Sequence, residues 1–161
     1  MKIRKTTFDD LAAVMEMYHQ ARIFMAEHGN PTQWGASKPE ENVIRNDINK
    51  GCSYVLEDNG QLIATFCYME GPDPTYAVIE DGKWLNDKPY SVVHRITSTG
   101  TVKGSASYCI NESLKKSGNL RIDTHKDNYV MQKLLKKLGF TYCGIIYVED
   151  GSKRLAYQKS I

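Results

Sequence analysis

The clearest candidate for chemistry is a small loop between an expected strand and an expected helix. The apolar run at residues 92–96 predicts the strand, the hydroxyl-rich segment 97–101 predicts a turn, and residues 102–106 open the helix. The first N–H groups of a helix have no partners within the helix, and they carry the positive end of its macrodipole. Gly104 and Ala106 leave the backbone accessible to an anion. The loop is therefore a candidate phosphate site, although an ordinary strand-to-helix turn explains the same spacing.

The elements that must position this loop follow from hydrophobic periodicity and from turn residues. A helix with a buried Met and Tyr stripe begins at Leu11, after a Thr7–Asp10 capping pair, and stops at Gly29. The remaining helices are expected at about 39–49, 104–116 and 128–138, and strands at 2–6, 52–57, 61–69, 89–97, 120–124, 141–148 and 154–159. The order β-α-α-β-β-β-α-β-α-β-β predicts an α/β (α+β) fold, a mixed and mostly antiparallel twisted sheet flanked by helices.

A long connection at residues 71–89 interrupts this pattern. Its length is unusual for a compact domain unless it forms a lid or a binding element. Tyr76, Trp84 and two prolines indicate an ordered excursion. The Asp-Asn-Gly sequence at 58–60 is, by contrast, a strong signal for a tight hairpin.

Composition excludes several classes of protein. The chain of 161 residues is expected to form one domain, 1–161, and its 41% hydrophobic and 25% charged residues are typical of a soluble globular protein. The net charge is only +2, and basic and acidic residues are interleaved along the chain, so the sequence shows no basic patch of the kind that binds nucleic acid. No apolar run is long enough to cross a membrane. The four cysteines contain no C-x-x-C pair and the four histidines show no metal spacing, so no metal is expected. Reduced cysteines and a first strand in place of a signal peptide predict a cytoplasmic protein.

Two sequence motifs carry a resemblance to a known family. The segment TVKGSA at 101–106 is similar to the pyrophosphate-binding Q/R-x-x-G-x-G/A loop of the GNAT superfamily of N-acetyltransferases, with Thr101 in place of Gln or Arg. At the spacing of that family, residues 120–140 resemble its strand and its N-x-x-A-x-x-L-Y-x-K-x-G-F helix. Together the motifs span about residues 90–147.

The resemblance implies that acetyl-CoA is the co-substrate. Backbone groups of His94, Arg95 and Ile96 would address the thioester and pantetheine. Asn128 would hydrogen-bond the cofactor arm, although a helix N-cap is an equally good explanation of it. The pyrophosphate would lie on the loop formed by Thr101, Val102, Lys103, Gly104, Ser105 and Ala106.

The acid and base are the point at which the sequence departs from the family. The tyrosine that donates a proton in many members is Leu135 here, and a glutamate used by some members is Tyr90. Asp123 and His125 lie two residues apart, so they point to one face and are candidates for a carboxylate-oriented imidazole. Tyr90 and Tyr129 are the other catalytic candidates, and deprotonation through water stays open.

The acceptor is expected to be a primary amine on a small molecule, because an aromatic-rich insertion favours a closed pocket. Trp34, Tyr76 and Trp84 are the candidates for its walls. Two alternatives stay open: a noncatalytic acyl-CoA-binding module, and an N-acetyltransferase of proteins or peptides. The sequence also leaves open whether two copies pair as a homodimer.

Overall fold

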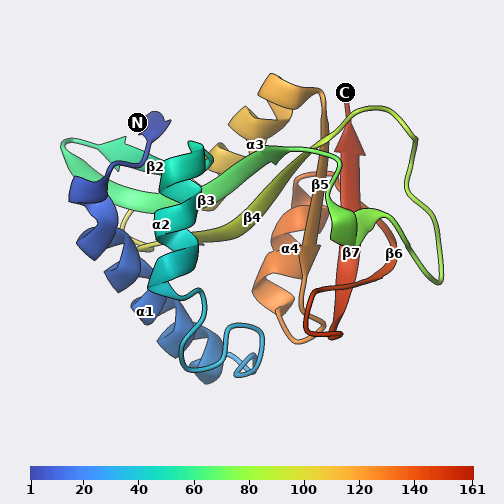
Figure 1. Ribbon diagram of the computed structural model, residues 1–161, viewed down its shortest axis with the longest axis horizontal. Coiled ribbons are helices and arrows are strands. Elements are labelled where there is room, and N and C mark those ends of the chain that lie inside the picture. Colours follow the sequence, from blue (N-terminus) through green and yellow to red (C-terminus); the bar gives the residue numbers. More distant parts are fainter. The chain divides into compact units, whose positions relative to one another are not determined.

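The computed structural model describes all 161 residues (Figure 1). The expected order of elements is confirmed, and the strands and helices start and end within about two residues of their expected positions. The strands are β1 (Lys2–Lys5), β2 (Ser53–Asp58), β3 (Gln61–Glu70), β4 (Ser91–Ser98), β5 (Asn119–Thr124), β6 (Thr141–Tyr147) and β7 (Lys153–Ser160). The helices are α1 (Leu11–Glu27), α2 (Glu41–Lys50), α3 (Ser105–Ser117) and α4 (Tyr129–Lys137).

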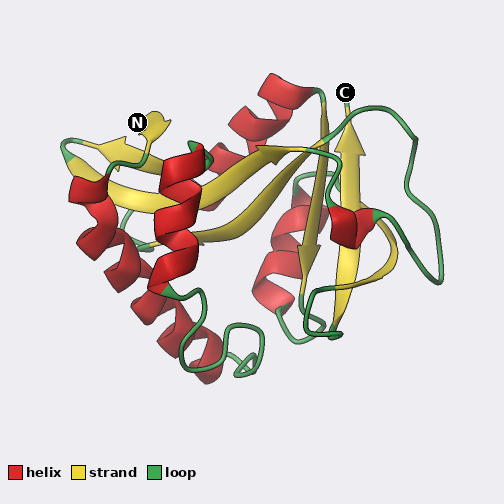
Figure 2. Ribbon diagram, viewed as in Figure 1, coloured by secondary structure: helices red, strands yellow, loops and turns green.

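The strands form a seven-stranded sheet in the order β1-β2-β3-β4-β5-β7-β6. Strands are yellow and helices are red in Figure 2. The pairs β1–β2, β2–β3, β5–β7 and β6–β7 are antiparallel, as expected for a mostly antiparallel sheet. β4 and β5 are parallel, with Ser91 and Val92 opposite Leu120 and Arg121. The parallel pair follows from the chain order, because the crossover through α3 returns the chain in the direction of β4.

The chain forms two compact units, which are described separately. The first contains residues 1–68 and 94–109, and the second contains residues 69–93 and 110–161. β3, β4 and α3 contribute residues to both. None of the helices combines the length and the apolar character that crossing a bilayer requires.

The core of the first unit lies where α1 and α2 meet β2. The expected apolar stripe of α1 supplies most of it, and the cluster comprises Leu11, Val14, Met17, Tyr18, Ile44 and Val55. The predicted Thr7–Asp10 capping box closes a short 3-10 turn (Phe8–Asp10) that leads into α1, and in it the Thr7 amide donates to the Asp10 carboxylate at 2.8 Å. Arg4 on β1 binds the same carboxylate with two nitrogens, at 2.8 and 2.9 Å, which joins the first strand to the first helix.

The core of the second unit includes the 71–89 excursion. Tyr76, Val92, Ile146 and Ala156 form its buried cluster, against which Trp84 and other partly buried side chains pack. The excursion is ordered, as predicted: it contains a short 3-10 turn (Pro74–Tyr76) and a bridge between Glu80 and Ile145 of β6. The Leu85 amide also donates to the side-chain oxygen of Gln158 on β7.

Candidate functional site

The proposed phosphate loop leaves a run of backbone donors without partners. The first i-to-i−4 bond of α3 runs from the Tyr108 N–H to the Gly104 carbonyl, at 2.9 Å. The N–H groups of residues 102–107 make no hydrogen bond within the chain. The Ser105 hydroxyl donates to the Val102 carbonyl at 2.6 Å, which holds the turn closed. The loop therefore presents the positive end of α3 with its donors available.

Gly104 is required in this loop by its backbone conformation. Its φ of +82° lies in the left-handed region, which side chains with a Cβ rarely adopt. A Cβ placed there would meet no atom within 4 Å. Strain of the backbone, rather than a lack of space in the free protein, therefore selects glycine. Ala106, by contrast, lies in the first turn of α3 and needs no special φ.

Arg95, in the middle of β4, has an unusual backbone. Its φ is +53°, a left-handed value that is uncommon for a residue with a side chain and costs on the order of 1–3 kcal/mol. Such a residue interrupts the regular ladder of a strand. The irregularity falls within the three residues that the family resemblance assigns to the thioester.

Two buried side chains hold Arg95 in place. The Tyr18 hydroxyl of α1 donates to the Arg95 carbonyl at 2.7 Å. The Asp47 carboxylate of α2 accepts from the Arg95 guanidinium at 2.8 and 3.1 Å. Asp47 was not among the residues predicted from the sequence, although an acidic residue beside Ile44 and Ile48 on the inward face of α2 indicates a buried ion pair.

Asn128 is the N-cap of α4, because its side-chain oxygen accepts the Met131 N–H at 3.0 Å. The capping explanation offered with the resemblance is thus confirmed. The contact with a cofactor arm, which the family resemblance implies for Asn128, stays a prediction.

The structure gives Asp123 and His125 partners that the sequence did not predict. Asp123 accepts a hydrogen bond of 2.6 Å from the hydroxyl of Tyr76, which is 1% exposed. The His125 Nδ1 accepts the N–H of Asp127 at 3.0 Å. Burial, and then the nearby Arg154, lowers the pKa of His125 below its usual value, so the ring is neutral near pH 7. With Nδ1 as acceptor, the neutral ring carries its proton on Nε2, and no nitrogen is left to act as a base without breaking this bond.

Tyr90 and Trp84 enclose the guanidinium of Arg121. The guanidinium carbon lies 3.9 Å from the centre of the Tyr90 ring and 4.1 Å from that of Trp84. The Tyr90 hydroxyl accepts the Asp73 N–H at 2.8 Å, and the Trp84 indole donates to the Tyr76 carbonyl at 3.0 Å. These contacts give both aromatic side chains a structural role, Trp84 within the excursion and Tyr90 directly after it.

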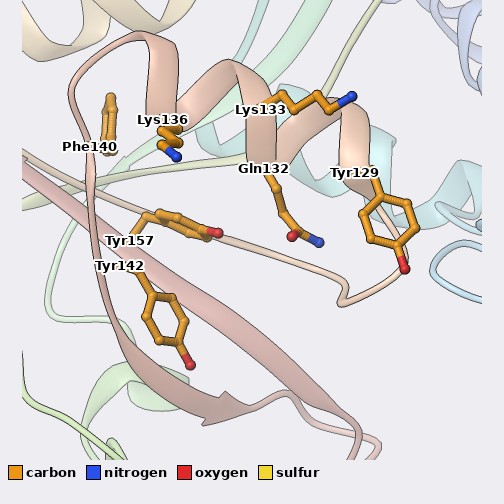
Figure 3. Close-up of a pocket in the computed structure, with 7 residues that line it drawn as sticks. All are labelled: Tyr129, Gln132, Lys133, Lys136, Phe140, Tyr142 and Tyr157. Atoms are coloured by element: carbon orange, nitrogen blue, oxygen red, sulfur yellow. The ribbon is translucent and has the colours of Figure 1, made fainter.

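The remaining aromatic candidates have different surroundings. Trp34 is partly buried and packs edge-to-face on Tyr18, with ring centres 5.4 Å apart, against the core of the first unit. Tyr129 is 59% exposed at the start of α4. It lines a pocket of about 560 Å³ together with six residues from α4, β6, β7 and the segment before β6, namely Gln132, Lys133, Lys136, Phe140, Tyr142 and Tyr157 (Figure 3). Leu135, which occupies the position of the family tyrosine, is fully buried.

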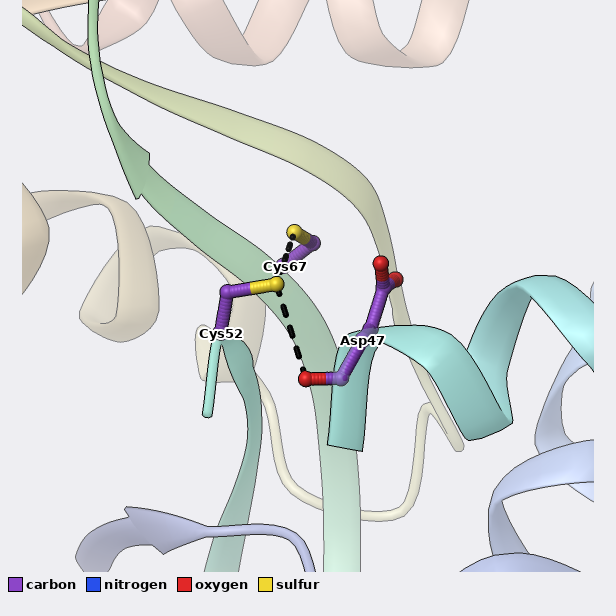
Figure 4. Close-up of side chains that lie close together, drawn as sticks. All are labelled: Asp47, Cys52 and Cys67. Carbon is purple, nitrogen blue, oxygen red and sulfur yellow. Dashed lines mark hydrogen bonds between the residues drawn. The ribbon is translucent and has the colours of Figure 1, made fainter. Parts of the chain in front are cut away.

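One cluster of potential metal ligands was not predicted. Asp47, Cys52 and Cys67 place one ligand atom each within 4.8 Å of one another (Figure 4). All four cysteines are buried and none is in a disulfide, which agrees with the reduced state expected from the sequence. The C-x-x-C criterion missed this pair because the two cysteines come from the ends of a hairpin.

Comparison with known proteins identifies the class of fold. A GNAT-family acetyltransferase of Streptococcus agalactiae is 32% identical, with a TM-score of 0.89 over 99% of this chain and 95% of that chain. A ribosomal-protein-alanine N-acetyltransferase of Brucella melitensis is 18% identical, with a TM-score of 0.63 and full coverage of both chains. The NatC complex bound to Gag peptide and CoA contains a chain that is 12% identical, with a TM-score of 0.64, over 100% of this chain and 99% of that chain. The last two show a common fold alone.

These similarities, with the loop before α3 and the observed order of strands, define a GNAT acetyltransferase fold. The chain belongs to the GNAT family. No protein-family model and no curated protein matches the sequence.

Proposed function

We propose that this protein is an N-acetyltransferase that transfers the acetyl group of acetyl-CoA directly to a primary amine of a small molecule. Membership of the GNAT family supports acyl transfer in general. CoA is bound in one structure with the same fold, the NatC complex. These similarities do not extend to the amine acceptor or to direct transfer, which are our proposals.

The observation that carries the proposal is the row of unpartnered N–H groups at residues 102–107. A pyrophosphate carries negative charge, and backbone donors at the start of a helix bind such an anion without a lysine side chain. Gly104 gives this loop its left-handed turn. Lys103 is exposed and adds a positive charge nearby.

The irregular residue in β4 supports a role for His94, Arg95 and Ile96 at the thioester. Acetyl transfer develops negative charge on the carbonyl oxygen, and fixed backbone donors stabilise that charge well because they need no reorganisation. The contacts of Tyr18 and Asp47 with Arg95 fix the backbone at this point. The two residues are therefore positioning residues in this proposal.

Few side chains are available to transfer the protons that the reaction moves. The amine must be neutral when it attacks the carbonyl carbon, and the departing thiolate must receive a proton. Leu135 cannot donate one, and Nδ1 of His125 is already an acceptor. We propose that water removes the amine proton, and that Tyr129, the most exposed of the candidates, is the first residue to test as the acid.

The test is release of CoA from acetyl-CoA, measured against a panel of small primary amines and of peptides with free N-termini. Turnover with a small amine, and none with peptides, supports the proposal. Turnover with peptides alone would show that the acceptor is a peptide and not a small molecule. Saturable binding of acetyl-CoA without any acceptor-dependent release of CoA would assign the chain to the noncatalytic acyl-CoA-binding modules.

A further inference from the structure

Two cysteines that lie far apart in the sequence face each other inside the first unit. Cys52 immediately precedes β2 and Cys67 lies on β3, and their sulfur atoms are 3.5 Å apart (Figure 4). The two residues are 8% and 2% exposed. A disulfide needs a distance of about 2.05 Å between the sulfur atoms, so the pair would have to close by about 1.5 Å.

A metal ion is a poor occupant for this cluster. The third potential ligand is the Asp47 carboxylate, which already accepts two hydrogen bonds from Arg95, at 2.8 and 3.1 Å. A metal would have to displace a guanidinium from a carboxylate that is 7% exposed, and would bring another positive charge beside it. The thiol pair, by contrast, needs no third group to react.

The same cluster is joined to the irregular residue of β4. The Cys52 thiol contacts the backbone carbonyl of Asp47 at 3.5 Å, the Asp47 carboxylate holds the Arg95 guanidinium, and Tyr18 holds the Arg95 carbonyl. Closing the two sulfur atoms removes the thiol hydrogen that Cys52 donates to Asp47. The Cys52 N–H also donates to the Asp47 backbone carbonyl, at 3.0 Å, so a shift of Cys52 towards Cys67 would pull on the backbone of Asp47, the residue that fixes Arg95.

We propose that Cys52 and Cys67 form a reversible intramolecular disulfide in the presence of a peroxide, and that this bond weakens acetyl-CoA binding by displacing Asp47 and Arg95. The second part rests on the proposed function. The first part concerns only the two thiols.

The chemistry balances with hydrogen peroxide as the oxidant. The thiolate of one cysteine attacks a peroxide oxygen, which gives a sulfenic acid and releases hydroxide, and the hydroxide takes up a proton to form water. The thiolate of the other cysteine then attacks the sulfenic sulfur and expels a second hydroxide, which is also protonated to water. Two thiols and one peroxide thus give one disulfide and two waters. Burial raises the pKa of both thiols, so we expect the first step to be slower than for an exposed cysteine.

The first test counts thiols on the full-length protein. The native protein is treated with hydrogen peroxide, denatured, alkylated with N-ethylmaleimide and weighed by mass spectrometry. We expect two of the four cysteines to escape alkylation and a disulfide-linked peptide to join Cys52 with Cys67. Cys109→Ser, which removes another buried thiol, should still form this bond, and Cys67→Ser should not. Four alkylated thiols, or sulfinic acid in place of the disulfide, would overturn the proposal.

The second test measures the dissociation constant of acetyl-CoA for the reduced protein, the oxidised protein and the oxidised protein after dithiothreitol. We expect oxidation to weaken binding at least tenfold and dithiothreitol to restore it. Equal affinities in the presence of the disulfide would overturn the coupling to Arg95. If the reduced protein does not bind acetyl-CoA, the proposed function and the coupling both fail, whereas the thiol count still decides the first part.

Discussion

At the scale of single residues, the hydrogen bond at Nδ1 of His125 decides what this side chain can do. The nitrogen accepts the Asp127 N–H, and the lowered pKa keeps the ring neutral near pH 7. We therefore expect His125→Ala to leave turnover within about threefold of wild type, in a steady-state assay at saturating acetyl-CoA. A loss of about 10²–10⁴-fold with unchanged affinity for acetyl-CoA would instead make His125 the general base, as the sequence alone suggested.

A second prediction at this scale concerns acid stability. The hydrogen bonds from Arg4 lower the pKa of Asp10 from 3.8 to about 2. Because the pKa is lower in the folded state, Asp10 stabilises the fold above pH 4, and the contribution is lost as the pH falls through about 2. Its size at pH 7 is about 2 kcal/mol.

Asp10→Asn should therefore lower the free energy of unfolding by about 2 kcal/mol at pH 7, and the difference from wild type should shrink towards pH 2. Urea unfolding at a series of pH values measures both. Asp9→Asn is the matched control, because Asp9 is an exposed neighbour and makes no ion pair. A difference that is the same at pH 2 and pH 7 would show that the Arg4 contact does not set the stability.

At the scale of elements, the 71–89 excursion is packed as part of the second unit. Trp84 donates to Tyr76 and covers Arg121, so its loss would remove core contacts and leave a guanidinium without one aromatic face. We expect Trp84→Ala to lower the free energy of unfolding by about 3 kcal/mol. Leu85→Ala, in the same segment but 47% exposed, should change it by less than about 1 kcal/mol.

Chemical denaturation of the two variants distinguishes this role from the acceptor wall predicted from sequence. Normal stability of Trp84→Ala, together with a higher Michaelis constant for the amine alone, would assign Trp84 to the acceptor. The backbone of Leu85 keeps its bond to Gln158 in either variant, so the anchoring of the segment is not disturbed by the control.

At the scale of the whole molecule, the order of elements was predictable because caps, turns and apolar periodicity are local. The contacts that hold Arg95 were not, since Tyr18, Asp47 and Arg95 come from three separate elements. The contact between the two cysteines was predictable only in part. Cys52 and Cys67 each lie seven residues outward from the Asn59–Gly60 turn, so the hairpin predicted from sequence already brings them together. A bulge at Leu56 and Glu57 shifts the register, which places Ser53 opposite Cys67, and only the structure shows that the sulfur atoms still meet.

The proposed function requires an anion bound at the start of α3, and Ala106→Glu is the substitution that tests this site. Gly104 is less suitable, because any side chain there would strain a left-handed backbone. Ala106 is helical, so a glutamate complements the helix dipole and should leave the melting temperature of the free protein unchanged or slightly higher. Asn42→Glu is the matched control, at the same position in the first turn of α2.

The decisive measurement is calorimetric titration of acetyl-CoA into wild type, Ala106→Glu and Asn42→Glu. We predict saturable binding to wild type and to Asn42→Glu. For Ala106→Glu we predict a dissociation constant weaker by about 10²–10⁴-fold, because two charge-assisted hydrogen bonds of about 1.5–3 kcal/mol each are lost. Binding to Ala106→Glu within threefold of wild type, or no heat with wild type at millimolar acetyl-CoA, would contradict the account.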